Sequence, residues 1–430
     1  MKPRLSTFQI VLLVVFGALA VAGVLIFAFA IGGSGNASIG TVSVWGTLDA
    51  TAFEVVLRQA ADSDPRLNQV TYEQKDSATY EQDLTDALAN GQGPDLFIMT
   101  EEYAVRDVGK IVPIPYASLS QKQFQDTFVQ SADPFLSKSG VIAVPILADP
   151  LVLYFNRDML QAAGFAQPPQ YWDQLHDMAQ KITKQNDAGV ILKSAIALGE
   201  YRNVDNAKDI LATLILQAGN TITTFDTSGR LVSALAPKLG GSSASESALR
   251  FYTEFADPAK VFYTWNRSLP EARQAFAAGD VALYIGYASE LALIKRTNPN
   301  LNFATAPVPQ ASSKVLDSAR VYGFATARTS KNPQGAVTVA YLLSTTDVTK
   351  AFATAYGIPS ARRDVLSQTV QGDQGLFNRM AILSHSWIDP DPTATADMFR
   401  VMIEDTTSGS VLLTEAVQRA DQTLGHILGL

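Results

Sequence analysis

The chain has 430 residues, of which 47% are hydrophobic and 17% are charged. Because one domain usually takes about 100–200 residues, this length predicts at least two packed lobes, and the apolar content excludes a largely disordered chain. Asp and Glu outnumber Lys and Arg by 41 to 33 without a basic cluster, which argues against a nucleic-acid partner. The lack of cysteine excludes disulfides, thiolate metal sites and a lipidated N-terminal cysteine.

The first feature along the chain is an uncharged apolar run over residues 10–31. As a helix, a run of this length spans the roughly 30 Å hydrocarbon core of a bilayer. Lys2 and Arg4 precede it, so the positive-inside rule places residues 1–9 in the cytoplasm and the rest of the chain outside it. We therefore predict a single-pass anchor followed by a glycine-rich tether at residues 32–40. The alternative is a secretory signal that is cleaved near Ala30, which leaves a secreted body.

The next hundred residues alternate between strand and helix patterns. Strands are expected at residues 41–45, 69–73 and 94–99, and helices after an N-cap at Asp49 and after a capping box that begins at Thr79. The order β-α-β-α-β predicts a parallel sheet with helices on both faces. In such a sheet, ligands bind at the carboxyl ends of the strands. This rule selects polar and aromatic groups near residues 45–49, 74–76 and 100–103 as candidates.

Much of the remainder of the chain reads as a second, mainly helical lobe. Two apolar stretches at residues 141–145 and 151–155 flank residues 148–150, which we expect to cross between lobes. Helix patterns follow at residues 171–182, 205–218, 246–256, 270–278, 333–343, 375–383, 394–404 and 411–428, with strand or extended patterns at 281–285, 303–309 and 321–327. A small sheet covered by helices is therefore expected there.

Catalytic signatures do not stand out in the sequence. The three histidines, His176, His385 and His426, have no metal-ligand spacing, and the glycine-rich loops of nucleotide binding and the nucleophile elbow of hydrolases do not occur. Glu101 and Glu102 are adjacent, whereas paired glycosidase carboxylates come from separate segments. We therefore expect no enzyme activity, no cofactor and no metal.

Residues 142–175 carry a family resemblance, and they read IAVPILADPLVLYFNRDMLQAAGFAQPPQYWDQL. This segment closely resembles family 1 extracellular solute-binding proteins, the sugar-binding receptors of ABC importers. Further pieces agree in order along the chain, at residues 93–97, 275–283, 307–309, 330–336 and 357–360. Independently of the resemblance, Asp158 is expected to cap a short helix that Gly164 ends, and Trp172 is expected in the buried face of the next helix.

The resemblance implies an α/β fold of the type II periplasmic-binding-protein kind, with two lobes that close on a ligand about a hinge. Lobe 1 is expected to comprise residues 41–147 and about 306–356, and lobe 2 residues 148–305 and about 357–430. The implied function is extracytoplasmic capture of a mono- or oligosaccharide and its delivery to an ABC permease. A ligand-sensing or scaffold ectodomain and an extracellular glycan-acting enzyme are the alternatives. The sequence leaves the identity of the ligand open.

Sugar sites combine aromatic platforms with polar hydrogen-bonding groups, so the candidate ligand residues are of these two kinds. They are Trp45, Asp49, Glu101, Glu102, Tyr103, Asp149, Trp265, Tyr287, Tyr322, Arg362 and Trp387. Several have structural alternatives: Trp45 and Trp265 can pack in a core, Asp49 can cap its helix, and Glu101 to Tyr103 can be solvated loop residues. Tyr287 follows Gly286, where many relatives carry a tryptophan, and the resemblance is imperfect there.

Overall fold

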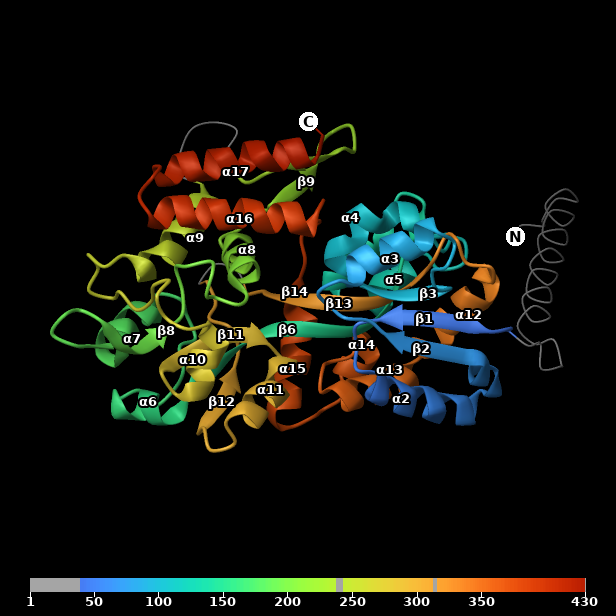
Figure 1. Ribbon diagram of the computed structural model, residues 1–430, viewed down its shortest axis with the longest axis horizontal. Helices are drawn as coiled ribbons and strands as arrows, with labels where there is room; N and C mark the ends of the chain where they lie inside the picture. The colour runs from blue at the N-terminus through green and yellow to red at the C-terminus, as the bar shows by residue number, and fades with distance from the viewer. Residues whose placement is uncertain (1–38, 237–242, 312–314, 430) are drawn as a thin grey trace, which may run out of the picture.

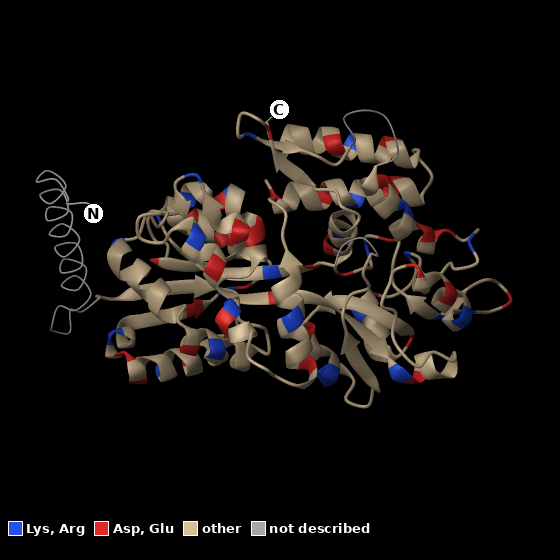
Figure 2. Ribbon diagram, turned by 180° about the vertical axis from the view of Figure 1, so that it is seen from behind, with Lys and Arg blue, Asp and Glu red and all other residues tan. Residues whose placement is uncertain are grey.

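The computed structural model describes residues 39–236, 243–311 and 315–429. The predicted anchor at residues 10–31, the cleavage site near Ala30 and the tether up to residue 38 lie outside the described residues. Within the described ranges, no helix is both long and apolar enough to cross a bilayer. Figure 1 shows two lobes side by side, and Figure 2 shows Lys and Arg interspersed with Asp and Glu over both of them.

The first lobe begins with the predicted alternation of strands and helices. Its elements are β1 (Val42–Gly46), α2 (Ala50–Ser63), β2 (Val70–Gln74), α3 (Tyr80–Ala89), β3 (Leu96–Thr100), the 3-10 helix η2 (Glu101–Tyr103), α4 (Ala104–Asp107) and α5 (Gln121–Thr127), joined later by α12 (Pro333–Leu343), α13 (Thr346–Tyr356) and α14 (Arg363–Leu366). Strand β1 pairs in parallel with both β2 and β3, which confirms the predicted parallel unit. Helices α2 and α13 lie on one side of these strands and α3 on the other (Figure 1).

The second lobe is mainly helical around a small sheet. Its elements are α6 (Arg157–Ala162), α7 (Gln174–Ile182), β7 (Lys184–Gln185), β8 (Ile191–Ile196), α8 (Ala207–Gln217), β9 (Thr223–Phe225), β10 (Leu231–Ser233), α9 (Ala244–Thr253), α10 (Ala272–Ala278), β11 (Val281–Tyr287), α11 (Glu290–Thr297), β12 (Phe303–Ala306), α15 (Gly372–Leu383), α16 (Pro392–Thr407) and α17 (Leu413–Ile427). Strand β11 pairs in parallel with β8 and antiparallel with β6.

Two long strands connect the lobes. Strands β6 (Val144–Asn156) and β13 (Asp317–Thr326) lie at the centre of a sheet with the order β2-β1-β3-β13-β6-β11-β8-β7. The first half of β6 pairs with β13 and its second half pairs with β11 and β12, so one strand serves both lobes. Residues 148–150 therefore do lie where the chain crosses between the lobes, as expected, but they belong to one continuous strand instead of separating two. Pro150 sits where β6 changes partners, a position at which its missing N–H costs little.

Buried side chains form two separate cores, one for each lobe. Ala306 and Val308 belong to the second core, while Ile358, Ala361 and Leu366 belong to the first. The chain thus returns to the first lobe after Val308 and leaves it again after Leu366. Both points lie later in the chain than the expected boundaries near residues 306 and 357. The two-lobed α/β architecture itself agrees with the expectation.

Two expected caps differ from the structure. Asn156, not Asp158, caps α6, because its side chain accepts a hydrogen bond from the N–H of Met159. Thr79 does precede α3, but its hydroxyl donates to Asp83 instead of closing a capping box. Trp172 is buried in the second core, as predicted.

Candidate functional site

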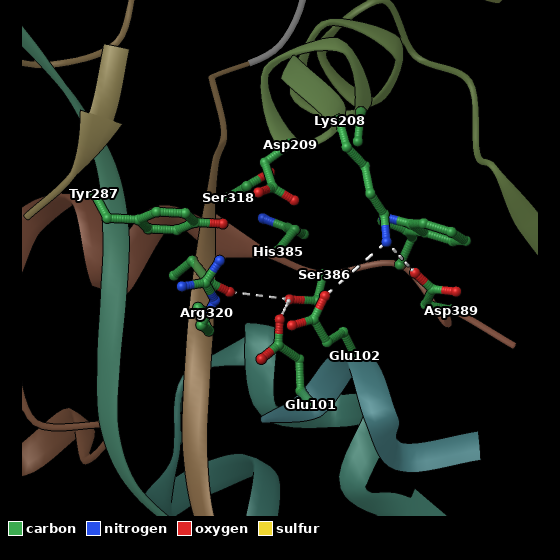
Figure 3. A pocket seen from close by; sticks show the side chains of 13 residues that line it. Glu101, Glu102, Lys208, Asp209, Tyr287, Ser318, Arg320, His385, Ser386 and Asp389 are labelled. Carbon is green, nitrogen blue, oxygen red and sulfur yellow. Dashed lines mark hydrogen bonds and ion pairs between the residues drawn. The ribbon is translucent and has the colours of Figure 1, made fainter. Parts of the chain in front are cut away.

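A cavity of about 40 Å³ lies between the two lobes, where β13 passes the carboxyl end of β3 (Figure 3). Its lining comes from η2, the first two turns of α8, the end of β11, β13, and the segment from β14 (Ser384–His385) to α16. The lining residues are Glu101, Glu102, Lys208, Asp209, Ala212, Tyr287, Ser318, Ala319, Arg320, His385, Ser386, Trp387 and Asp389. Sequentially distant segments therefore meet at one polar and aromatic site.

Glu101 is buried at the floor of this cavity because η2 turns it under β13. Its carboxyl group accepts hydrogen bonds from the N–H of Val321 at 2.6 Å and from the hydroxyl of Ser386 at 3.3 Å. Burial, together with the neighbouring charge of Glu102, raises the pKa of Glu101 to about 8. At neutral pH Glu101 is therefore mainly protonated, and it joins β13 to the segment after β14 (Figure 3).

Lys208 crosses the cavity from the second lobe toward the first. Its ammonium group lies 2.7 Å from Asp389 Oδ2 and 4.0 Å from Glu102 Oε2, and it stands 5.7 Å from the ring centre of Trp387. Burial raises the pKa of Asp389 to about 6, although the charge of Lys208 acts in the opposite direction. This cluster links α8, the segment before α16 and η2, so it holds both lobes together at the cavity.

Arg320 and Tyr287 form the opposite wall of the cavity. The guanidinium carbon of Arg320 lies 4.3 Å from the ring centre of Tyr287, a cation–π arrangement. The ring is fixed through its own backbone, since the hydroxyl of Tyr154 donates to the Tyr287 carbonyl at 2.7 Å. Burial raises the pKa of Tyr287 well above its usual range, so its hydroxyl stays protonated. Asp209 faces this hydroxyl from the first turn of α8 (Figure 3).

Four of the predicted ligand residues line the cavity, namely Glu101, Glu102, Tyr287 and Trp387. Asp149 and Tyr322 lie nearby on β6 and β13 but are not among its lining residues. Asp149 is fully buried and accepts a hydrogen bond from the N–H of Ser289 at 2.9 Å. Burial raises the pKa of Asp149 to about 6.

Three predicted residues of the first lobe do not line the cavity. The side chain of Asp49 caps α2 by accepting from the N–H of Ala52, as its structural alternative proposed. Trp45 is half-buried, and Lys75 stands 3.6 Å above its ring centre. Arg106 covers the ring of Tyr103 at 4.9 Å. The side chains of Asp49, Trp45 and Tyr103 therefore make their contacts within the first lobe.

Two further predicted ligand residues, Arg362 and Trp265, do not line the cavity. Arg362 is tied to its own lobe, because it pairs with Asp364 at 2.9 Å and donates to the carbonyl of Ser344. Trp265 is 1% exposed in the second core, and its Nε1 donates to Asn203 Oδ1 at 3.1 Å. Trp265 therefore packs in the second core, which is the structural alternative given for it.

Trp265→Ala is expected to lower the free energy of unfolding by about 3–5 kcal/mol, because it empties a large buried volume and leaves Asn203 without this donor. Urea denaturation of both proteins measures the loss. A change below about 1 kcal/mol would contradict the burial of the ring. Leu412→Ala is the control, since Leu412 is 78% exposed and its truncation should change little.

Sequence reasoning missed most polar members of the cavity. These are Lys208, Asp209, Ser318, Arg320, His385, Ser386 and Asp389. Two signals were present. Arg320 directly precedes the apolar strand pattern at residues 321–327, and Lys208 and Asp209 open a helix that is buried from Ile210 to Gln217. Such isolated charges in apolar elements are candidates for a site.

The fold and cavity together define a two-lobed α/β binding protein whose site is shared by both lobes. Residues 59–378 match the family model of bacterial extracellular solute-binding proteins. This match covers more than half of the chain, and the chain belongs to that family. The resemblance seen in the sequence is thereby confirmed.

Curated relatives align over a short stretch. A binding protein of Brucella abortus is 28% identical over 102 residues, which are 24% of this chain and 25% of that protein. A binding protein of Brucella suis aligns to the same extent. The match thus spans a quarter of the length of these relatives.

Solved structures with the same fold align over nearly the whole chain. The ABC-transporter solute-binding protein of Thermotoga lettingae, bound with alpha-D-tagatose, has a TM-score of 0.67 at 20% identity and covers 91% of this chain and 100% of its own. The cyclic alpha-maltosyl-1,6-maltose binding protein of Arthrobacter globiformis has a TM-score of 0.74 at 15% identity, over 90% and 98%. The maltotriose binding protein of Thermus thermophilus, bound with maltotriose, has a TM-score of 0.68 at 18% identity, and the alignment covers 90% of this chain and 100% of that protein. At these identities the likeness establishes the fold.

Proposed function

We propose that this chain is an extracytoplasmic binding protein that captures a carbohydrate between its lobes and delivers it to an ABC permease. The observation that carries the proposal is the interlobe cavity, in which the faces of Tyr287 and Trp387 accompany charged hydrogen-bonding groups. Aromatic faces suit the C–H surface of a sugar, and charged groups suit its hydroxyls. Family membership and the sugars bound by proteins of the same fold support the same choice.

Ligand capture requires the lobes to move. A cavity of about 40 Å³ has room for about three water molecules, whereas small-molecule sites usually measure about 300–1,000 Å³. The lobes must therefore separate to admit a sugar and then close on it. Strands β6 and β13 are two of the connections about which such a hinge would work. Closure by a ligand requires contacts that exist only in the closed state, and residues from both lobes line this cavity.

The body of the protein is held at a membrane and acts by binding alone. Residues 10–31 anchor the body at the outer side of the cytoplasmic membrane, with the permease as partner. The protein itself breaks no bond, and transport draws its energy from a separate ATPase. These assignments are supported by the uncharged apolar run after Lys2 and Arg4 and by the binding proteins that share the family and the fold.

Thermal unfolding with a panel of sugars tests the function. Purified body should gain several degrees in melting temperature with at least one neutral sugar, such as D-glucose, D-tagatose, maltose or maltotriose, because a ligand that binds only the folded state stabilises it. The sugar should be recovered unchanged by chromatography. Release of shorter products from an oligosaccharide would instead favour an enzyme. Failure of every sugar to shift the transition would overturn the proposal.

A further inference from the structure

A groove of about 750 Å³ lies on the second lobe and shares no lining residue with the interlobe cavity. Most of its lining comes from residues 167–171, from β12 with the turn that follows it, and from α15. In the view of Figure 1, β12 and α15 lie below β6, whereas α8, which borders the cavity, lies above it. The groove is therefore a separate feature that the proposed function does not use.

The groove has the size and the lining of a small-molecule site. Pockets for small ligands usually measure about 300–1,000 Å³ and are mainly apolar. Pro169, Tyr171 and Met380 are among the residues that line this groove. Two main-chain hydrogen bonds, at 2.9 and 3.4 Å, tie residues 170–172 to Gln310, which also lines it. This part of the lining is thus held in place without a ligand, which reduces the ordering cost of binding.

Two arginines in the groove have no anionic partner. Arg157 opens α6 and Arg379 lies on α15, and both residues line the groove and are exposed. Within the described ranges, neither guanidinium forms an ion pair or a side-chain hydrogen bond. The residues outside those ranges contain no Asp or Glu that could supply an acidic partner. Both guanidiniums are therefore available to an anion that enters the groove.

The acidic residue of this lining, Asp373, is already engaged. Its carboxylate accepts a hydrogen bond from the hydroxyl of Thr305 at 2.7 Å and lies 3.4 Å from the ammonium group of Lys295. Arg157 and Arg379 thus give the lining two positive charges against one negative charge, which is shared with a lysine. This local excess is opposite in sign to the formal charge of −8 on the whole chain.

The chemistry of these groups specifies the class of ligand. A single exposed arginine is an ordinary surface residue, but here two of them share one groove with apolar side chains. A guanidinium only donates hydrogen bonds, and its planar fork fits the oxygens of an anionic group such as a carboxylate. We propose that the groove is a second ligand site, which binds a small organic anion with an apolar body. This inference does not depend on the carbohydrate function.

Fluorescence titration with two matched probes tests the site. The probes are 1-anilinonaphthalene-8-sulfonate and N-phenyl-1-naphthylamine, which share their aromatic rings and differ in the anionic group. Both cores lie within residues 39–429, so the body without the apolar run is used. Wild type should bind the sulfonate about tenfold more tightly than the uncharged probe. The double variant Arg157→Gln/Arg379→Gln should lose this preference, with its affinity for the uncharged probe changed less than about twofold.

A control variant separates the groove from general attraction between charges. Arg58→Gln/Arg250→Gln removes the same charge from two exposed arginines that lie on α2 and α9, outside the groove, and it should bind both probes as wild type does. Tyr171→Ala should weaken both probes, because it removes an aromatic part of the lining. Thermal unfolding without probe verifies that the variants are folded.

Three results would overturn the second site. They are no binding of the sulfonate to wild type, equal affinity of wild type for the two probes, and equal weakening of the sulfonate by the groove variant and the control variant. None of these results bears on sugar capture, because the groove and the interlobe cavity have no lining residue in common. Conversely, failure of every sugar to bind would leave the second site standing.

Discussion

Lys208→Met is expected to lower the free energy of unfolding by about 3–5 kcal/mol at pH 7, because it leaves a buried carboxylate without its cation. Asp389 is 3% exposed and lies 2.7 Å from the Lys208 ammonium. Methionine keeps an unbranched apolar stem, so the packing of α8 should be preserved. Urea denaturation measures the effect, which should shrink at pH 5, where Asp389, with its pKa raised to about 6, binds a proton.

A double-mutant cycle separates this interaction from simple loss of packing. Asp389→Asn removes the stranded charge, so the double variant should recover much of the stability that Lys208→Met loses. Lys193→Met is a matched control, because Lys193 also pairs with an aspartate, Asp280, at 2.6 Å, but both side chains are about half exposed. Its loss should stay below about 1 kcal/mol. Equal losses for Lys208→Met and Lys193→Met would contradict a buried cross-cavity pair.

The first lobe was predictable because its signals are local. Asp49 caps α2 through the N–H of Ala52, only three residues along the chain. The strand patterns at residues 41–45 and 69–73 correspond to β1 and β2. The rule that ligands bind at strand ends then led to Glu101 and Glu102, which follow β3 directly. The sequence pattern was sufficient to predict helices, strands and caps wherever residues close together in the chain determine them.

The rest of the site depends on pairing between distant segments. Arg320 reaches the cavity only because β13 inserts between β3 and β6, which are separated from it by more than 150 residues. Trp265 was proposed as a ligand residue for a related reason. Its neighbour Thr264 is polar, which is typical of a loop, yet the Thr264 hydroxyl is buried and donates to the Ile196 carbonyl at 2.8 Å. Polar residues that are satisfied by distant backbone groups look exposed in a sequence.

Glu101→Gln is expected to stabilise the protein at pH 9 by on the order of 4 kcal/mol, with the gain falling toward zero near pH 4.5. Burial raises the pKa of Glu101 to about 8, so the folded state holds a proton that the unfolded state releases above about pH 4.5. The stability contributed by the neutral carboxyl is therefore present at low pH and is lost as pH rises through about 8. Glutamine remains neutral throughout, and its amide oxygen can still accept from the N–H of Val321.

Urea denaturation at pH 5, 7 and 9 measures this dependence, with Glu54→Gln as the control because Glu54 is exposed on α2. Asp149 and Asp389 also have pKa values raised to about 6, so most of their titration is complete below pH 8. A stability difference that grows between pH 7 and pH 9 therefore reports Glu101. A variant that is less stable than wild type at pH 9 would show that Glu101 is needed as an ion. In that case Glu101 would carry a negative charge at the floor of the cavity. The assignment of a neutral Glu101 carboxyl that joins β13 to Ser386 would then be wrong.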